Sequence, residues 1–195
     1  MKSFKKIYLI AGVATIMSGN TLAVETLNSN ATVTVNNAFT LAESAAMTFG
    51  TIRATADTAA AATASLTLPA DGSAGSVTAA TPASANIVVI TSGTPASFTI
   101  ANAAPSTALT LTLPAGTVNL TTPGGTAGFT VGTFNAIVRG GPNDGDAYAA
   151  SNLITDGAGA VGFDVGATLT TDASTPASDY LDGTYTGSYT VQVDY

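Results

Sequence analysis

Acidic residues are the only side chains in this sequence whose types and spacing suggest site chemistry. Asn143, Asp144 and Asp146 surround Gly145, and together with Asp156 they offer oxygen ligands of the kind that Ca²⁺ prefers. Their spacing does not match an EF-hand loop, so a solvated turn is the favoured interpretation. Asp179 and Asp182 flank Tyr180 and offer a carboxylate pair, but a glycosidase would need a sugar platform that a chain without tryptophan does not provide.

The sequence contains no histidine and no cysteine. Nucleophile activation of the Ser-His-Asp or Cys-His type and ordinary zinc sites are therefore excluded. We expect no enzyme activity, no catalytic residue, no cofactor and no metal. The absence of cysteine also leaves packing and backbone pairing to hold the fold without disulfides.

The first 23 residues resemble a secretory signal peptide. Lys2, Lys5 and Lys6 precede the apolar run 7–17, and the sequence TLA at 21–23 predicts cleavage after Ala23. An apolar run of this length is too short to span a bilayer, so we expect no membrane insertion after cleavage. We expect a secreted protein that crosses the periplasm of a Gram-negative bacterium to the cell surface.

The mature chain is strongly acidic. Arg53 and Arg139 are its only basic side chains, against twelve acidic residues, which gives a formal charge of −10. Such a surface repels phosphate backbones, so nucleic acid is excluded as a partner. The two arginines are expected either in ion pairs within the domain or in contacts with acidic neighbours.

Alternation of apolar and polar residues with a period of two predicts an all-β fold. About eight to ten short strands, separated by turn residues, indicate an antiparallel, immunoglobulin-like sandwich in residues 42–195. In the run 129–138 the apolar face changes phase, which predicts a β-bulge near Gly132 and Thr133. The continuous apolar run 87–91 is typical of a strand buried on both faces. The chain ends with an expected strand over 183–195.

The N-terminal run of the mature chain, within 24–41, alternates over 15 residues. Its odd positions form an apolar face with Leu27, Val33, Val35, Phe39 and Leu41. Two interpretations stay open: the run pairs within its own domain, or it completes the sheet of a neighbouring molecule. In the second case the acceptor edge is expected at the C-terminal strand, on the face formed by Tyr185, Tyr189, Val191, Val193 and Tyr195.

Three stretches resemble the bacterial family called domain of unknown function 4402: ATVTVNNAFTLAESAAMTFGTI (31–52), VGFDVGATL (161–169) and DGTYTGSYTVQVDY (182–195). The arrangement is also similar, more distantly, to spore-coat-U-like pilins of the archaic chaperone–usher pathway. Those pilins usually carry a disulfide, which this sequence cannot form.

The pilin resemblance implies an incomplete sandwich completed by strand exchange, with a periplasmic chaperone, an outer-membrane usher and identical or related subunits as partners. The expected function is then that of a fimbrial structural subunit in adhesion or biofilm formation. The alternative is a monomeric secreted sandwich that binds a surface glycan or a protein ligand.

Overall fold

The computed structural model describes residues 26–35, 38–81, 84–174 and 178–195. The predicted signal peptide lies outside the described residues. Two units are distinguished, Met1–Val35 and Asn36–Tyr195. Within the first unit, the described residues 26–35 form no strand and their side chains are exposed.

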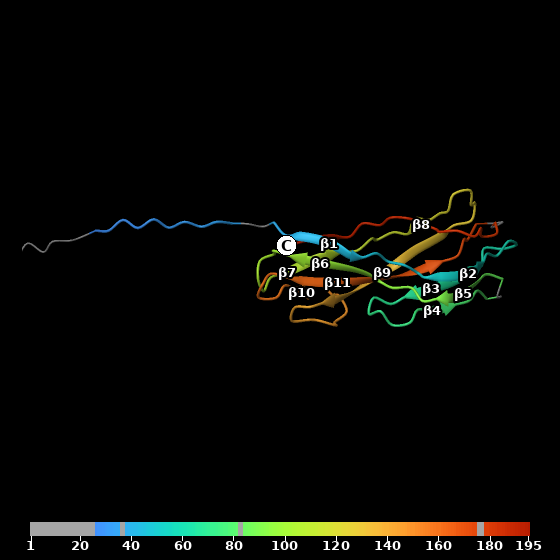
Figure 1. Ribbon diagram of the computed structural model, residues 1–195, viewed down its shortest axis with the longest axis horizontal. Helices are drawn as coiled ribbons and strands as arrows, with labels where there is room; N and C mark the ends of the chain where they lie inside the picture. Colours follow the sequence, from blue (N-terminus) through green and yellow to red (C-terminus); the bar gives the residue numbers. More distant parts are fainter. Residues whose placement is uncertain (1–25, 36–37, 82–83, 175–177) are drawn as a thin grey trace, which may run out of the picture. The chain divides into compact units, whose positions relative to one another are not determined.

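The second unit is all-β, as the alternation predicts, with twelve strands and no helix in the described ranges (Figure 1). Among these residues there is also no helix long and apolar enough to cross a membrane. The strands are β1 (Thr40–Ala45), β2 (Thr51–Thr55), β3 (Ser65–Leu68), β4 (Ser76–Thr78), β5 (Asn86–Thr91), β6 (Ala96–Ala101), β7 (Ala108–Thr112), β8 (Val118–Leu120), β9 (Phe129–Arg139), β10 (Leu153–Ile154), β11 (Val161–Thr170) and β12 (Gln192–Asp194).

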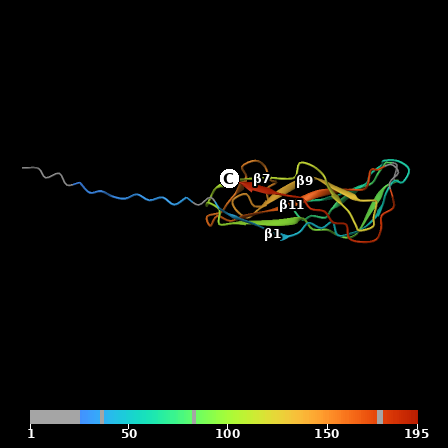
Figure 2. The same cartoon turned by 90° about the horizontal axis from the view of Figure 1, so that it is seen from above.

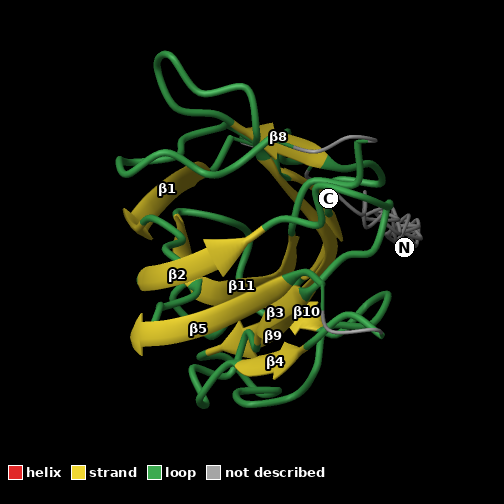
Figure 3. Cartoon of the chain, turned by 90° about the vertical axis from the view of Figure 1, so that its right-hand side faces the viewer, coloured by secondary structure: helices red, strands yellow, loops and turns green. Residues whose placement is uncertain are grey.

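The strands form three antiparallel sheets. The largest has seven strands, a three-stranded sheet has the order β10-β7-β12, and β2 pairs with β5 alone. In the largest sheet, β9 pairs along most of β11, while β6 and β3 follow one another along its other side. Figure 3 shows β2 and β5 lying side by side. The molecule is therefore sandwich-like, with β11 as its central strand.

Strand β11 is central because it is paired along both of its edges, with β9 on one side and with β6 and β3 on the other. Its odd positions carry apolar side chains, and Phe163 is fully buried and stacked on Phe98 with ring centroids 5.0 Å apart. On the even face, Gly166 lies where a Cβ atom would come within 2.4 Å of the Leu68 carbonyl oxygen, so only glycine fits. One core cluster covers the first half of the strand and a second covers its last part.

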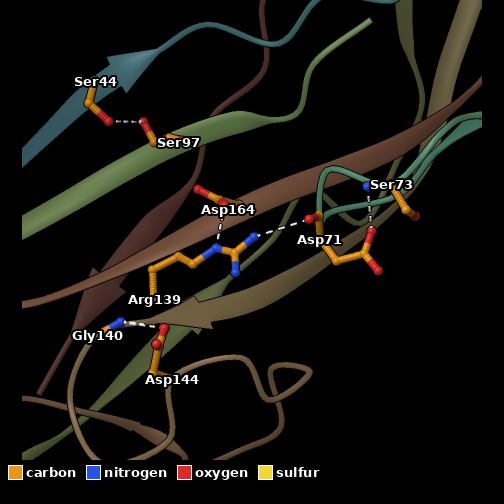
Figure 4. A network of polar contacts seen from close by, with 8 residues as sticks. All are labelled: Ser44, Asp71, Ser73, Ser97, Arg139, Gly140, Asp144 and Asp164. Carbon is orange, nitrogen blue, oxygen red and sulfur yellow. Dashed lines mark hydrogen bonds and ion pairs between the residues drawn. The ribbon is translucent and has the colours of Figure 1, made fainter. Parts of the chain in front are cut away.

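Arg139 fastens the loop after β3 to the outer face of this sheet. Its guanidinium forms an ion pair with Asp164 of β11 and donates a hydrogen bond to the backbone oxygen of Asp71 (Figure 4). The Asp71 carboxylate in turn accepts a hydrogen bond from the backbone N–H of Ser73. The pKa of Asp71 is lowered, chiefly by its hydrogen bonds from Ser73. Arg139 thus forms the ion pair within the domain that was one of its two predicted roles.

The predicted bulge in β9 is confirmed. In the pairing of β11 with β9, Gly166 lies opposite Asn135 and Thr168 lies opposite Gly132. Two steps along β11 thus correspond to three steps along β9, so β9 has one extra residue there. Thr133 has a φ of 52°, a left-handed conformation that costs a β-branched residue free energy.

The prediction for the run 87–91 is wrong. It forms β5, but Val88 is 49% exposed and Ile90 63% exposed, while Ile87 is buried. The physical reason is that β5 pairs only with β2, and this two-stranded ribbon covers the core with one face while its other face meets solvent.

Replacing Thr133 with glycine is expected to stabilise the domain by up to about 1 kcal/mol, because relief of the left-handed strain outweighs the entropy that glycine loses on folding. The same replacement at Thr130, in a regular part of β9, is expected to destabilise by about 0.5–1 kcal/mol. Urea unfolding of both variants measures the two changes. If both variants changed the free energy of unfolding equally and with the same sign, the left-handed strain at the bulge would not be the cause of the effect at Thr133.

Candidate functional site

A cavity of about 770 Å³ lies between the N-terminal edge of the domain and the C-terminal segment. One side is formed by residues 47–54, which include most of β2, and the other by residues 180–187 with Tyr189. The floor is apolar and comes from β8, β9 and β11, through Val118, Leu120, Phe129, Val131 and Leu169. The cavity is therefore a gap in the wall of the sandwich over one of its two core clusters.

Residues 40–55 form one bordering edge, and they pair on one side only. Strand β1 pairs with β6, Thr48 exchanges two backbone hydrogen bonds with Thr94, and β2 pairs with β5. On their other side, which faces the cavity, these strands have no backbone partner among the described residues. This edge is thus a row of unpaired backbone donors and acceptors about 16 residues long.

The C-terminal segment forms the second edge. Thr186 exchanges backbone hydrogen bonds with Thr121, and β12 pairs with β7, so this segment is also paired on one side within the described ranges. The two edges meet at one end, where the Phe39 and Tyr195 rings are in edge-to-face contact at 5.4 Å. Figure 1 shows the C terminus beside the start of β1, and Figure 2 shows β1 and the C-terminal strand as separate layers.

An aromatic cluster holds the C-terminal segment at the other end of the cavity. Tyr180 stacks on Phe129 with centroids 4.3 Å apart, and Tyr185 packs edge-on against Phe129. The Tyr180 hydroxyl donates to the Gly128 carbonyl and accepts from the Asp172 N–H. Burial raises the pKa of Tyr180 to about 12. This cluster fixes the position of the second edge although the segment around it forms no regular strand.

Tyr189 lies between the two ends of the C-terminal segment, and its ring packs against Phe134 at 5.3 Å. Its hydroxyl is buried and has no hydrogen-bond partner among the described residues. Burial raises the pKa of Tyr189 to about 12, and the nearby charge of Glu43 acts in the same direction. An unpaired buried hydroxyl costs about 1–3 kcal/mol.

The structure divides the predicted N-terminal apolar face into two parts. Leu27, Val33 and Val35 are 94%, 86% and 73% exposed. Phe39 and Leu41 are half-buried and pack against the domain's own core. Leu41 belongs to β1 and pairs there with Ile100 of β6. The alternation runs through both parts without a break, so it could not indicate where the domain begins.

The predicted C-terminal face lies toward the core. Tyr189, Val191 and Val193 pack against one core cluster and Tyr185 against the other, while Tyr195 contacts Phe39. Only Gln192–Asp194 form a regular strand, which is shorter than the predicted strand over 183–195. The segment pairs only at separate places, since its backbone partners among the described residues are Thr121 and β7.

One whole side of the cavity, residues 47–54, contains no residue that the sequence predicted as part of a site. Met47, Phe49, Ile52 and Ala54 point toward the core, and the inward positions change from odd to even between Phe49 and Ile52. A register shift between Thr51 and Ile52 accounts for this change of phase. The change was visible in the sequence, but nothing there indicated an unpaired edge.

The acidic stretch around Gly145 forms a turn. Asp144 accepts a hydrogen bond from the Gly140 N–H, and the Asn143 side chain donates to the Asn152 carbonyl. Among the described residues, no group of three or more acidic, histidine or cysteine side chains is placed to hold a metal ion.

The fold and the cavity define an all-β protein with a gap between its first strands and its C-terminal segment. A family model described as domain of unknown function (DUF4402) matches residues 39–195. The chain belongs to this family. No curated protein and no solved structure shows a significant match to the chain.

Replacing Tyr189 with phenylalanine is expected to raise the free energy of unfolding by about 1 kcal/mol, because the variant no longer buries an unpaired hydroxyl. Tyr148 is the matched control, since its hydroxyl accepts a hydrogen bond from the Leu111 N–H at 2.8 Å. Its replacement with phenylalanine should lower stability by about 1–3 kcal/mol. Urea unfolding decides, and a loss of stability in the Tyr189 variant would contradict the unpaired state of its hydroxyl.

Proposed function

We propose that this protein is the structural subunit of a surface fibre, in which the cavity is completed by an extended strand from a neighbouring subunit. The observation that carries the proposal is a cavity with an apolar floor, bordered by two strand edges that are each paired on one side only among the described residues. A strand inserted there would pair with both edges and cover the apolar floor. Binding of this kind is strand addition to a sheet.

The chain itself offers a suitable strand in residues 26–35. Their apolar residues alternate with Asn and Thr, so one face would fill the cavity while the other meets solvent. Burying the exposed side chains of Leu27, Val33 and Val35 would contribute about 5–9 kcal/mol before the cost of ordering the segment. Backbone hydrogen bonds on both sides of the strand would add to this.

The subunits of such a fibre need protection before assembly, because an exposed strand edge of this length pairs readily with other chains and leads to aggregation. We propose export by the N-terminal signal peptide, protection of the cavity by a periplasmic chaperone and release through an outer-membrane usher. The finished fibre would lie at the cell surface of a Gram-negative bacterium and support adhesion or biofilm formation. It would act by its mechanical continuity and not by catalysis.

A second function is favoured by the size of the cavity. A volume of about 770 Å³ lies in the range of small-molecule sites, and tyrosines line one side of it. A monomeric secreted protein that binds a glycan or another ligand in this cavity is therefore the alternative. It would give no role to the exposed apolar side chains of residues 26–35.

Replacing both Val33 and Val35 with aspartate is expected to abolish assembly of the full chain, because the two charges would have to be buried against the apolar floor of the cavity. The matched control replaces Thr32 and Thr34 with aspartate, which adds the same charge to the opposite face and should leave assembly intact. Size-exclusion chromatography and electron microscopy measure the outcome. Assembly of the Val33 and Val35 variant like the parent chain, or a monomeric parent chain, would contradict the proposal.

A further inference from the structure

We propose that two copies of this chain also meet through the rims of their cavities, related by a two-fold axis. In this contact the β2–β5 ribbon of each copy lies on residues 181–182 of the other, and Arg53 of one copy pairs with Asp182 of the second. The contact uses neither residues 26–35 nor the floor of the cavity. It is therefore a second interface that goes beyond the proposed function.

The outer face of the β2–β5 ribbon is apolar around one positive charge. Strands β2 and β5 lie side by side (Figure 3), and Arg53 lies directly opposite Val88 in their pairing. Val88, Ile90 and Arg53 are all exposed. Apolar side chains that gather on one exposed face of a domain are typical of a contact surface. The strand in the proposed function does not cover this face.

Arg53 determines what kind of partner fits this face. The other arginine of the mature chain, Arg139, is already paired with Asp164, whereas no described carboxylate lies within ion-pair distance of Arg53. A matching surface must therefore present a carboxylate beside an apolar side chain. The mature chain has twelve acidic residues and only two arginines, so a second copy supplies carboxylates in excess.

The opposite rim of the cavity has this combination. Leu181 is 49% exposed and is followed by the exposed Asp182, which forms no ion pair among the described residues. The backbone here is held in place, because the Tyr185 hydroxyl accepts a hydrogen bond from the Leu181 N–H and donates one to the Leu181 carbonyl oxygen, each at 3.0 Å. Tyr180, the preceding residue, stacks on Phe129. A surface that is already ordered loses little entropy on binding.

The two surfaces lie on opposite sides of one cavity. Arg53 and Ile90 line one side of it, and Leu181 and Asp182 line the other. Consider a second copy turned by 180° about an axis that runs along the cavity, between the two molecules. The ribbon of each copy then lies on residues 181–182 of the other, so that both Arg53–Asp182 pairs form together. The contact is self-complementary, as a two-fold interface must be.

A contact made by so few side chains belongs to the small and weak class of interfaces. Between free subunits it is therefore expected to be short-lived. In a fibre the same contact repeats at successive subunits, so many weak contacts act together. It would then hold two fibres side by side.

Cross-linking of single-cysteine chains tests the contact, and the chain has no native cysteine to interfere. Thr55 lies on the exposed face of β2, and Thr184 is exposed two residues after Asp182. Full chains carrying T55C are mixed with full chains carrying T184C, treated with a short bis-maleimide linker and separated on denaturing gels. We expect far more dimer from the mixture than from either chain alone. Equal amounts of dimer in all three samples would overturn the inference.

A chain that carries both T55C and T184C tests the two-fold relation. We expect a discrete dimer, because both links join the same two copies. A ladder of longer species would overturn the two-fold contact.

Charge reversal in this double-cysteine chain tests the ion pair. R53E or D182R should raise the chain concentration for half-maximal dimer at least about tenfold, because each turns two attractive charge pairs into two repulsive ones. R53E with D182R should restore it to within about threefold. The matched control is D146R, since Asp146 is exposed and does not line the cavity. A double reversal as weak as the single ones, or an equal effect of D146R, would overturn the inference.

The V33D/V35D substitutions separate this contact from the proposed function. The double-cysteine chain carrying them should form the same dimer, because the contact does not involve residues 26–35. Loss of the dimer there would overturn the inference. Assembly of V33D/V35D like the parent chain would contradict the proposed function and leave this contact standing.

Discussion

Backbone hydrogen bonding sets the main constraint on this molecule. A peptide group that loses water must find another partner, and the edges formed by residues 40–55 and by the C-terminal segment each have a row of such groups paired on one side only. Between them lies an apolar floor that water covers poorly. One extended strand satisfies both requirements at once, since its backbone pairs with the edges and its alternate side chains cover the floor. Few other ligands meet both demands.

The rest of the fold keeps the two edges apart. Strand β11 fixes the floor because it is paired on both sides and its Gly166 lets the β3 loop approach closely. The stack of Tyr180 on Phe129 holds the C-terminal segment in place through side chains. The backbone groups of this segment that face the cavity therefore need no partner for the segment to keep its position. Met47 and Phe49 hold the opposite edge against the core. The gap is therefore maintained by packing on both sides and does not depend on disulfides.

Sequence patterns predict the parts of this fold that depend on local alternation. The phase change near Gly132 and Thr133 is a local signal, and it located the bulge in β9 correctly. The run 87–91 shows where such reasoning fails, because hydrophobicity at Val88 and Ile90 says nothing about whether a second layer covers them. The cavity was not predicted for the same reason. Whether a strand has a neighbour on each side depends on the rest of the fold, and the residues of the strand itself do not indicate it. The alternating run that ends at residue 41 likewise has no change of sequence pattern at the point where the exposed residues end and β1 begins.

The exposed Val88 and Ile90 also bear on how a fibre would be held. A strand in the cavity would hold each subunit at one place only. The β2–β5 ribbon presents both apolar side chains together with Arg53 on its outer face. Under the proposed function this face would give neighbouring subunits a second contact, in which the two apolar side chains lose water and Arg53 meets the acidic surface of the next copy.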